Sequence, residues 1–407
     1  MGREFKVCNF SVVTEKKHVI FPLQYKIEVI LLKKMIQRTI LKNIEREFFQ
    51  KKAIVILGAR QVGKSTLLKN LFKNQESVLW LDAENPDVSL VFGNTTATRL
   101  KSFFGINKFV VIDEAQKIDN IGSKLKLITD HIKDVQVIAT GSSAFELRNK
   151  LNEPLTGRKF EHKLYPLSFV EMKNSIGLLE EIRMLPHRLV FGYYPEVVTT
   201  QNSEEKILRL LSDSYLYKDI LMLKGIRKPE KMKELLKALA WQIGSEVNYH
   251  ELGNLISLKS ETVEEYIHLL EQSFVIYRLN SFHTNHRNEI KKGKKVYFTD
   301  LGIRNAIIND FSAFETRKDK GNLFENYIIN EIIKDSEYNE RFEKFYFWRT
   351  NEQQEIDLII EKNGQLKTIE IKWNAKTKTN LPKTFSNKYP NSDFMVIHSE
   401  NFFECFL

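Results

Sequence analysis

The most informative stretch of the sequence is 53-AIVILGARQVGKSTLLKNLF-72. An apolar strand ends at Gly58, and the residues from Gly58 to Ser65 follow the spacing G-x-x-x-x-G-K-S. Apolar residues then recur at helical spacing up to Phe72. A strand, a glycine-containing loop and a helix in this order are the context that a P-loop requires, so we predict a phosphate-binding loop here.

The predicted loop offers phosphate ligands from its backbone and from three side chains. Its glycines allow the N–H groups of the loop and of the helix N-terminus to face a phosphate group. Lys64 is expected to reach the β- and γ-phosphates, Ser65 to hold Mg²⁺, and Thr66 to line the α-phosphate. The predicted nucleotide-binding residues are Gly58, Ala59, Arg60, Gln61, Val62, Gly63, Lys64, Ser65 and Thr66.

A second apolar strand ends in two acidic residues. In 109-FVVIDEAQKI-118, four apolar residues precede Asp113 and Glu114. Continuous apolar character is typical of a parallel strand that is covered on both faces. We expect Asp113 to hold the Mg²⁺ ion through water, and Glu114 to be the catalytic residue that orients and polarises the attacking water.

Two more apolar segments, 78–82 and 135–140, are predicted to join the same sheet. The second runs into a Gly-Ser-Ser turn at the sheet edge where α/β ligands bind, so Ser142 or Ser143 could sense the γ-phosphate. A simple hydroxyl-rich turn is the alternative interpretation. Further along, Arg158 could act as a catalytic arginine finger, in cis or in trans, or form an ordinary salt bridge.

Five segments together resemble a known family: LGARQVGKST, VIDEAQK, ATGSS, LTGRKFEHKLYPLSF and YYPEVV. The sequence from about Met35 onward is similar to AAA-like prokaryotic ATP-binding proteins. The resemblance implies an α/β fold in which a P-loop NTPase parallel sheet precedes a helical, winged-helix segment and a small α+β restriction-endonuclease-like domain. It implies that ATP and Mg²⁺ are the cofactors, and that Lys64, Ser65, Asp113 and Glu114 take the roles given above.

Length and composition limit the class of protein. A chain of 407 residues is too long for one ordinary core, and its apolar content of 42% excludes general disorder. The net charge of +10 suits a polyanionic partner, but a lysine-rich solvated surface gives the same total. The two cysteines, Cys8 and Cys405, cannot form a disulfide framework and suit a reducing cytoplasm. No segment is long and apolar enough to span a bilayer, so we expect a cytoplasmic protein without a membrane partner.

The start of the sequence is unusual. An amphipathic helix is predicted over 36–52, directly before the first strand, and Met35 stands just before this helix, whereas the residues before Met35 have no such organisation. The residues before Met35 are either an upstream extension, with Met35 as the true start, or a poorly ordered tail. The predicted domains are an N-terminal extension (1–34), a P-loop AAA-like ATPase (35–165), a helical linker or lid (166–228), a winged helix (229–298) and a PD-(D/E)XK-like domain (299–407).

The middle segment has a helix–turn–helix pattern. Helical patterns cover 229–244, 249–256 and 260–273, with Ser260 as the expected cap of the last helix. A strand over 274–280 and a basic stretch over 287–298 could be the wing of a winged helix.

The expected recognition helix is poorly suited to reading DNA. Its first turns carry Glu261, Glu264 and Glu265, which DNA phosphates would repel. The lysines at 291, 292, 294 and 295 could still contact phosphates. A winged helix that contacts a protein, or that is purely structural, is therefore favoured over a sequence-specific DNA reader.

Near the C-terminus, 355-EIDLIIEKNGQLKTIEIKW-373 is typical of a β-hairpin with an Asn-Gly turn. A two-residue type I′ turn places Lys362 opposite Gln365 and Leu358 opposite Ile369. Strict alternation then predicts two faces. The first face carries Ile356, Leu358, Ile360, Ile369 and Ile371. The second face carries Glu355, Asp357, Ile359, Thr368, Glu370 and Lys372.

In this register Asp357 lies opposite Glu370, and two like charges in that arrangement need a cation. Lys372 could supply it in part, and a divalent metal would do so better. The spacing D…E-x-K resembles PD-(D/E)XK nucleases, which implies that Glu325, Asp357 and Glu370 are metal ligands and that Lys372 is catalytic. A wet face of mixed charges is the alternative interpretation.

Three functions stay open on the sequence alone. The first is an ATPase whose nucleotide cycle controls a C-terminal nuclease-like domain that acts on DNA or RNA. The second is an ATP-dependent switch or interaction protein with an inactive nuclease-like domain and a protein partner. The third is a DNA-binding regulator. An oligomer is compatible with each of them.

Overall fold

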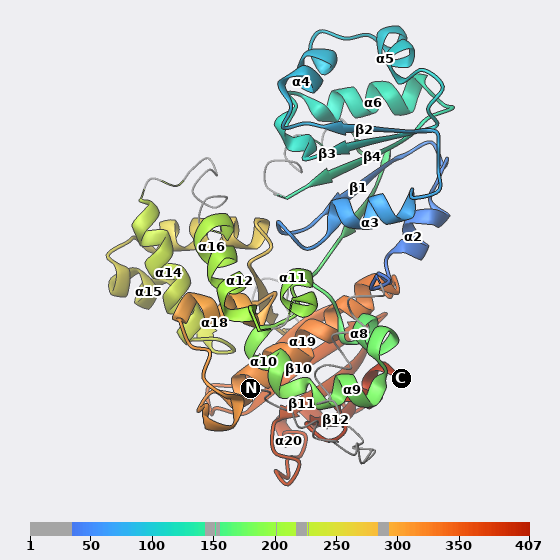
Figure 1. The fold of residues 1–407 in the computed structure, drawn as a ribbon. Coiled ribbons are helices and arrows are strands. Elements are labelled where there is room, and N and C mark those ends of the chain that lie inside the picture. The colour runs from blue at the N-terminus through green and yellow to red at the C-terminus, as the bar shows by residue number, and fades with distance from the viewer. Residues whose placement is uncertain are drawn as a thin grey trace, which may run out of the picture.

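The computed structural model describes two lobes joined by short helices (Figure 1). The predicted extension over 1–34 lies outside the described residues, and so do Ser143, Lys291 and Lys292. The described ranges are 35–142, 151, 155–200, 202–216, 226, 228–283 and 293–407.

The N-terminal lobe is built on a five-stranded parallel sheet of order β2-β3-β4-β1-β5, which confirms the predicted fold class. The strands β1 and β3, which precede the predicted nucleotide ligands, end at the same edge of the sheet because they run in the same direction. The bounds are β1 Ala53–Leu57, β2 Val78–Asp82, β3 Phe109–Asp113, β4 Gln136–Gly141 and β5 Lys159–Lys163.

Helices cover both faces of this sheet (Figure 1). On the central strand β1, Ile54 and Ile56 pack toward helix α3, whereas Val55 and Leu57 pack toward α4, α5 and α6. All five residues of β1 are fully buried, as the apolar run predicts. The bounds are α2 Leu41–Arg46, α3 Lys64–Leu71, α4 Pro86–Phe92, α5 Ala97–Phe104, η1 Ala115–Lys117 and α6 Ile121–His131.

The helix predicted over 36–52 is much shorter in the structure. Helix α2 ends at Arg46, because Phe49 and Lys51 adopt left-handed backbone conformations with φ of 57° and 59°. Such values are incompatible with a continuing right-handed helix. The amphipathic pattern therefore correctly indicated a helix but overestimated its length.

A run of short helices connects the two lobes. Helix α8 begins with a capping box in which Ser168 and Glu171 bond each other's backbone N–H groups. Proline occupies a first-turn position of α10 and α11. The bounds are α8 Phe169–Ile176, α9 Leu178–Arg183, α10 Leu185–Phe191, α11 Pro195–Thr199, α12 Glu204–Leu210 and the π-helical turn η2 Leu211–Leu216.

The second lobe contains a mixed seven-stranded sheet of order β12-β11-β10-β9-β7-β8-β6. Strand β7 pairs with β9 in parallel, so one sheet crosses the domain boundary predicted at 298/299, and the domain limits stay a prediction. The bounds are β6 Glu246–Val247, β7 Ile276–Ser281, β8 Lys294–Phe298, β9 Lys344–Arg349, β10 Glu355–Lys362, β11 Gln365–Lys372 and β12 Asp393–His398.

The middle segment has helices at the predicted places: α14 Pro229–Trp241, α15 Tyr249–Ile256 and α16 Ser260–Gln272. The cap of α16 was predicted wrongly. Lys259 is the N-cap and makes no side-chain cap hydrogen bond, so Ser260 is the first helical residue. The name winged helix stays a prediction for this segment.

The C-terminal hairpin has the predicted turn and register. Asn363 and Gly364 have φ of 52° and 81°, as a type I′ turn requires, and Lys362 lies opposite Gln365. Leu358 lies opposite Ile369, also as predicted.

The predicted division of the hairpin faces is wrong at Ile356. The pairing of β10 with β9 shifts between Ile356 and Ile359, which marks a β-bulge. A bulge adds a residue and breaks the alternation of faces. Ile356 and Ile359 consequently pack together against Phe385 of helix α20, whereas Leu358 belongs to the large core on the other face.

Helix α19 packs against β11 and is the longest helix among the described residues. Its apolar residues join a core that extends from β1 of the first lobe to the hairpin of the second. In the part of the chain that the structure describes, no helix could cross a lipid bilayer. The remaining bounds are α18 Leu301–Ile308, η3 Phe314–Thr316, α19 Lys320–Tyr338, α20 Lys383–Lys388 and η4 Phe402–Phe406.

Candidate functional site

A cavity of about 970 Å³ opens at the carboxyl edge of the parallel sheet. Six of the predicted nucleotide-binding residues line it, whereas Gly58, Ala59 and Val62 are buried in the loop beneath. Asp113 and Glu114 also line it, so the two sequence-distant motifs meet at one site. The six lining residues are Arg60, Gln61, Gly63, Lys64, Ser65 and Thr66.

The loop is shaped by close backbone packing. A Cβ atom at Gly58 would lie 2.3 Å from the carbonyl oxygen of Leu164, and Gly63 has a φ of 97°. Both positions therefore favour glycine. The Lys64 ammonium is 5% exposed and donates hydrogen bonds to the carbonyl oxygens of Gly58 (2.9 Å) and Ala59 (3.0 Å).

Ser65 and Asp113 form the polar pair at which Mg²⁺ was predicted. The Ser65 hydroxyl donates to the Asp113 carboxylate at 2.6 Å, and the Thr140 hydroxyl donates to the other carboxylate oxygen. Mg²⁺ is usually bound by one or two protein oxygens together with waters and substrate phosphates. A hydroxyl and a carboxylate side by side next to a phosphate-binding loop fit that requirement.

Glu114 is held over the cavity by two polar side chains. Its backbone is left-handed, with a φ of 52°, and its carboxylate accepts hydrogen bonds from Ser142 (2.7 Å) and from Gln116. The Lys64 ammonium lies 4.0 Å away. Ser142, the predicted sensor, thus contacts Glu114 and does not line the cavity. The role of Gln116 was missed, although the segment VIDEAQK contains it.

Arg158 lies far from this cavity. Its carbonyl oxygen accepts from the N–H of Ala53, at the start of β1, whereas the P-loop follows the end of that strand. Its guanidinium pairs with Asp130 at 2.7 Å. The prediction of a finger that acts in cis therefore does not hold in this structure, and the ordinary salt bridge is found.

Arg38 connects the P-loop to the second lobe, and no pattern in the sequence indicated this role. Its guanidinium is buried and donates to the carbonyl oxygens of Val62 (2.9 Å) and Tyr165 (2.5 Å). It also pairs with the Glu171 carboxylate at 3.1 Å and lies 3.5 Å from the Tyr338 hydroxyl at the end of α19. Burial opposes its charge, but Glu171 outweighs that effect and the pKa of Arg38 is raised.

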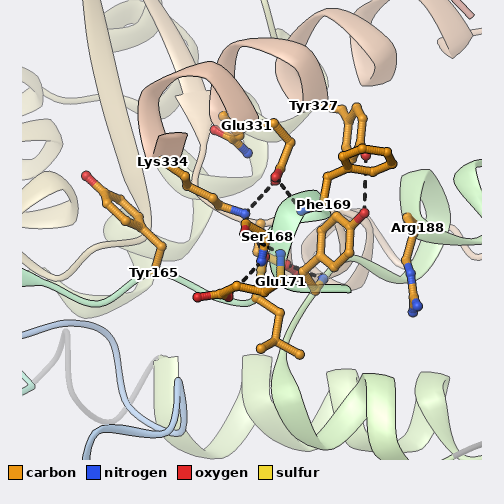
Figure 2. A network of polar contacts seen from close by, with 12 residues as sticks. Tyr165, Ser168, Phe169, Glu171, Arg188, Tyr327, Glu331 and Lys334 are labelled. Atoms are coloured by element: carbon orange, nitrogen blue, oxygen red, sulfur yellow. Dashed lines mark hydrogen bonds and ion pairs between the residues drawn. The ribbon is translucent and has the colours of Figure 1, made fainter. Parts of the chain in front are cut away.

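Two more charged residues of α19 hold the segment that precedes α8 (Figure 2). Glu331 accepts from the backbone N–H of Phe169 at 2.6 Å and pairs with Lys334 at 2.7 Å. Lys334 in turn donates to the carbonyl oxygen of Leu167 at 2.9 Å. Because these side chains are buried, α19 is fixed to the start of the connecting helices by directional polar contacts as well as by apolar packing.

The second predicted site, on the hairpin, is a cluster of carboxylates and cations. Glu325 of α19 faces β8, where it contacts Lys295 (3.1 Å) and Tyr297 (2.6 Å). Lys295 also pairs with Glu355 of the hairpin at 2.5 Å. Glu325 therefore contacts β8 directly, and Lys295 links it to Glu355 of the hairpin. Burial raises the pKa of Glu325 to about 7, and Lys295 opposes that rise.

Lys372 supplies a cation to both hairpin carboxylates, although the observed pairing of the two strands ends at Leu358 and Ile369 and does not include the predicted pair Asp357 and Glu370. Its ammonium lies 2.7 Å from Glu370 and 3.4 Å from Asp357. Asp357 also accepts the backbone N–H of Ile371 at 2.8 Å. Burial and the neighbouring Asp357 raise the pKa of Glu370, while Asp357 and Glu370 together raise the pKa of Lys372 against the effect of its own burial.

This cluster does not fit a metal ion as it stands. Within the described ranges, no three His, Cys, Asp or Glu side chains are grouped so that they could hold one. The carboxylates of Glu325, Asp357 and Glu370 instead contact lysine ammonium groups. The residues predicted as nuclease-like ligands are thus brought into one region, but with lysines between them.

Of the lysines predicted to contact phosphates, the two within the described residues, Lys294 and Lys295, are engaged elsewhere. Lys295 is 2% exposed, and Lys294 pairs with Glu264 of α16 at 3.3 Å. Glu261, Glu264 and Glu265 are exposed, as expected for an acidic helix surface. This part of the surface therefore opposes contact with a nucleic-acid backbone.

Comparison with known families assigns three parts of the chain. Residues 50–173 match the family model described as an AAA domain. Residues 182–314 and 320–404 match two domains of unknown function, DUF8612 and DUF4143.

The curated relatives are uncharacterized proteins. One from Haemophilus influenzae is 25% identical over 80% of this chain and 83% of its own. One from Methanocaldococcus jannaschii is 23% identical over 88% of this chain and 82% of its own.

Among solved structures, a Walker-type ATPase of Pyrococcus abyssi is 14% identical and covers 67% of this chain and 96% of its own, with a TM-score of 0.47. Cdc6p from Pyrobaculum aerophilum is 12% identical and covers 71% of this chain and 99% of its own, with a TM-score of 0.28. The family model over 50–173 coincides with the parallel sheet and its P-loop. The N-terminal lobe of this chain therefore has the P-loop NTPase fold and matches the AAA-domain family model.

Proposed function

We propose that this protein is a Mg²⁺-dependent ATPase whose nucleotide state acts on its C-terminal lobe. The observation that carries the first part is the meeting of Lys64, Ser65, Asp113 and Glu114 at one cavity. These four side chains supply the phosphate contact, the metal ligands and the base that phosphoryl transfer to water needs.

In this proposal each group has a separate task. The loop N–H groups and Lys64 hold the phosphates in line for attack, and Glu114 orients the water. Ser142 and Gln116 fix the Glu114 carboxylate, which limits the entropy lost when that water is positioned. Ser65 and Asp113 would hold Mg²⁺, which supplies charge neutralisation at the β- and γ-phosphates when it is bound.

Arg38 supports the second part of the proposal. It bonds the Val62 carbonyl within the P-loop and contacts Tyr338 at the end of α19, and it also lines the nucleotide cavity. Helix α19 carries Glu325 thirteen residues earlier, which is about 20 Å at 1.5 Å per residue. A shift of the P-loop on nucleotide binding would therefore reach the C-terminal cluster through a continuous, buried set of contacts.

For the C-terminal lobe, the contacts favour the switch or interaction protein over the active nuclease. Lysine-neutralised carboxylates do not fit a cleavage metal, so we derive no nucleic-acid cleavage step. Within the proposal, 229–298 is a winged helix that contacts a protein partner, and 299–407 is a PD-(D/E)XK-like domain that binds without cutting. A cytoplasmic location and an oligomeric assembly belong to the same proposal.

The test is an ATP hydrolysis assay on the full chain with Mg²⁺. Lys64→Ala is expected to reduce turnover at least about 100-fold, because a phosphate contact made in the transition state is lost. Lys69→Ala is the matched control, since Lys69 lies exposed on the same helix. Equal turnover of wild type and Lys64→Ala would contradict the assignment of the site.

A further inference from the structure

Lys295 is an ammonium group in the interior of the second lobe. It lies on β8, in the middle segment, and its side chain is 2% exposed. The ring of Phe347 lies 5.5 Å away from its Nζ atom. A buried lysine in such a place is costly unless carboxylates compensate its charge.

Two carboxylates from two different elements provide that compensation. Nζ of Lys295 lies 3.1 Å from Oε1 of Glu325 on α19 and 2.5 Å from Oε1 of Glu355 on β10. The side chains of these partners are 14% and 28% exposed. One ammonium group therefore joins the middle segment, the long helix and the hairpin.

Cations balance most of the negative charge of the cluster, although one of them, Arg349, also lies 4.0 Å from the carboxylate of Glu246. Four carboxylates, on Glu325, Glu355, Asp357 and Glu370, face three cationic side chains. Lys295 is the most buried of the three, and Lys372 and Arg349 are the other two. A divalent ion entering this cluster would meet little net negative charge, and the oxygens it needs already accept hydrogen bonds from lysine.

We propose that Lys295 occupies the cation position between Glu325 and Glu355 and competes there with divalent metal ions. The cluster is thereby closed to metal by a residue from a neighbouring segment of the chain. This inference goes beyond ATP hydrolysis and does not depend on it, because it concerns a different lobe. It also links the middle segment to the hairpin, because a displacement of β8 would move the Lys295 ammonium group away from Glu355.

The experiment measures Mn²⁺ binding to the full chain by calorimetry, without nucleotide. Lys295→Met keeps the length and apolar stem of the side chain but removes the charge. We expect it to bind one Mn²⁺ at least tenfold more tightly than wild type. Adding Glu355→Gln to Lys295→Met should abolish that gain. Lys294→Met is the matched control and should behave as wild type, because Lys294 lies on the same strand and pairs with Glu264.

Three results would overturn the proposal. The first is equal Mn²⁺ affinity of Lys295→Met and wild type. The second is a gain that persists when Glu355→Gln is added. The third, which needs no lysine variant, is tight Mn²⁺ binding by wild type that Glu355→Gln abolishes. If Lys295→Met does not fold, Lys295→Gln, which also removes the charge but leaves a polar group in the interior, takes its place with the same expected outcomes. ATP turnover, measured separately, reports on the nucleotide site alone.

Discussion

Replacing Arg38 by methionine should strongly destabilise the contact between the two lobes. The guanidinium is 7% exposed and its partner Glu171 is fully buried, so the substitution leaves a carboxylate without its cation. Two carbonyl oxygens, on Val62 and Tyr165, also lose their donor. Removal of one partner of a buried ion pair costs about 3–5 kcal/mol, so we expect a loss of that size in the free energy of unfolding.

The measurement is urea denaturation of the full chain, followed by circular dichroism. Arg46→Met is the matched control, because Arg46 forms a 3.0 Å ion pair with Glu340 while 63% exposed. Exposed pairs contribute at most about 1 kcal/mol, so this variant should resemble wild type.

A double-mutant cycle separates the contribution of the Arg38–Glu171 ion pair from that of the hydrogen bonds that Arg38 donates to Val62 and Tyr165. In Arg38→Met with Glu171→Gln, no buried carboxylate is left uncompensated, although the single amide oxygen can keep only one of the two backbone N–H bonds that Thr39 and Ser168 now donate to the carboxylate. The double variant should therefore be more stable than the sum of the single losses predicts, by about 1–3 kcal/mol. Simple additivity, or a loss from Arg38→Met no larger than that from Arg46→Met, would show that the buried pair does not hold the lobes together.

Three further predictions address single positions. The native state keeps the Glu325 proton until a pKa of about 7, whereas an unfolded glutamate releases it near 4.5, so the stability contributed by this group falls as pH rises between those values. In Glu325→Gln, the fall of the unfolding free energy across that pH interval should therefore be smaller than in wild type, by at most about 3 kcal/mol. An unchanged pH dependence would contradict the burial of that carboxyl. Gly58→Ala would place a Cβ atom 2.3 Å from the Leu164 carbonyl oxygen. The resulting strain should lower the free energy of unfolding by about 1–3 kcal/mol and abolish ATP binding in a fluorescent-nucleotide titration. Retained binding would contradict the proposal that close backbone packing shapes the loop. Arg158→Ala should leave the turnover of ATP by an isolated chain unchanged, because its partner is Asp130, and a large loss of turnover would point to a role in trans.

The sequence predicted best where the decisive relations are local. The P-loop, its helix and the hairpin turn are set by neighbouring residues, so Gly58, Gly63 and Asn363-Gly364 lie where their spacing placed them. The meeting of Asp113 with Ser65 was also expected, because parallel buried strands end at one edge.

What could not be predicted depends on long-range packing. The bulge that turns Ile356 away from Leu358 arises from pairing with β9, and nothing in the hairpin sequence encodes it. Lys295 was taken for a surface lysine of a wing, since a basic stretch gives no sign that one member is buried. Arg38 and Tyr338 are 300 residues apart, and no local pattern pairs them. The sequence left an arginine finger or a salt bridge open for Arg158, and only the fold shows that it lies at the end of the sheet away from the P-loop.

The most direct measurement is single-turnover ATP hydrolysis by Glu114→Gln beside wild type, with Mg²⁺ and with ATP binding followed in parallel. Glutamine keeps the shape of the side chain at position 114 but removes the negative charge that polarises water. We predict ATP binding within a factor of about three of wild type and hydrolysis slowed at least about 100-fold, as expected for loss of a general base. Hydrolysis at the wild-type rate, with binding intact, would contradict the assignment of this cavity as the ATPase site.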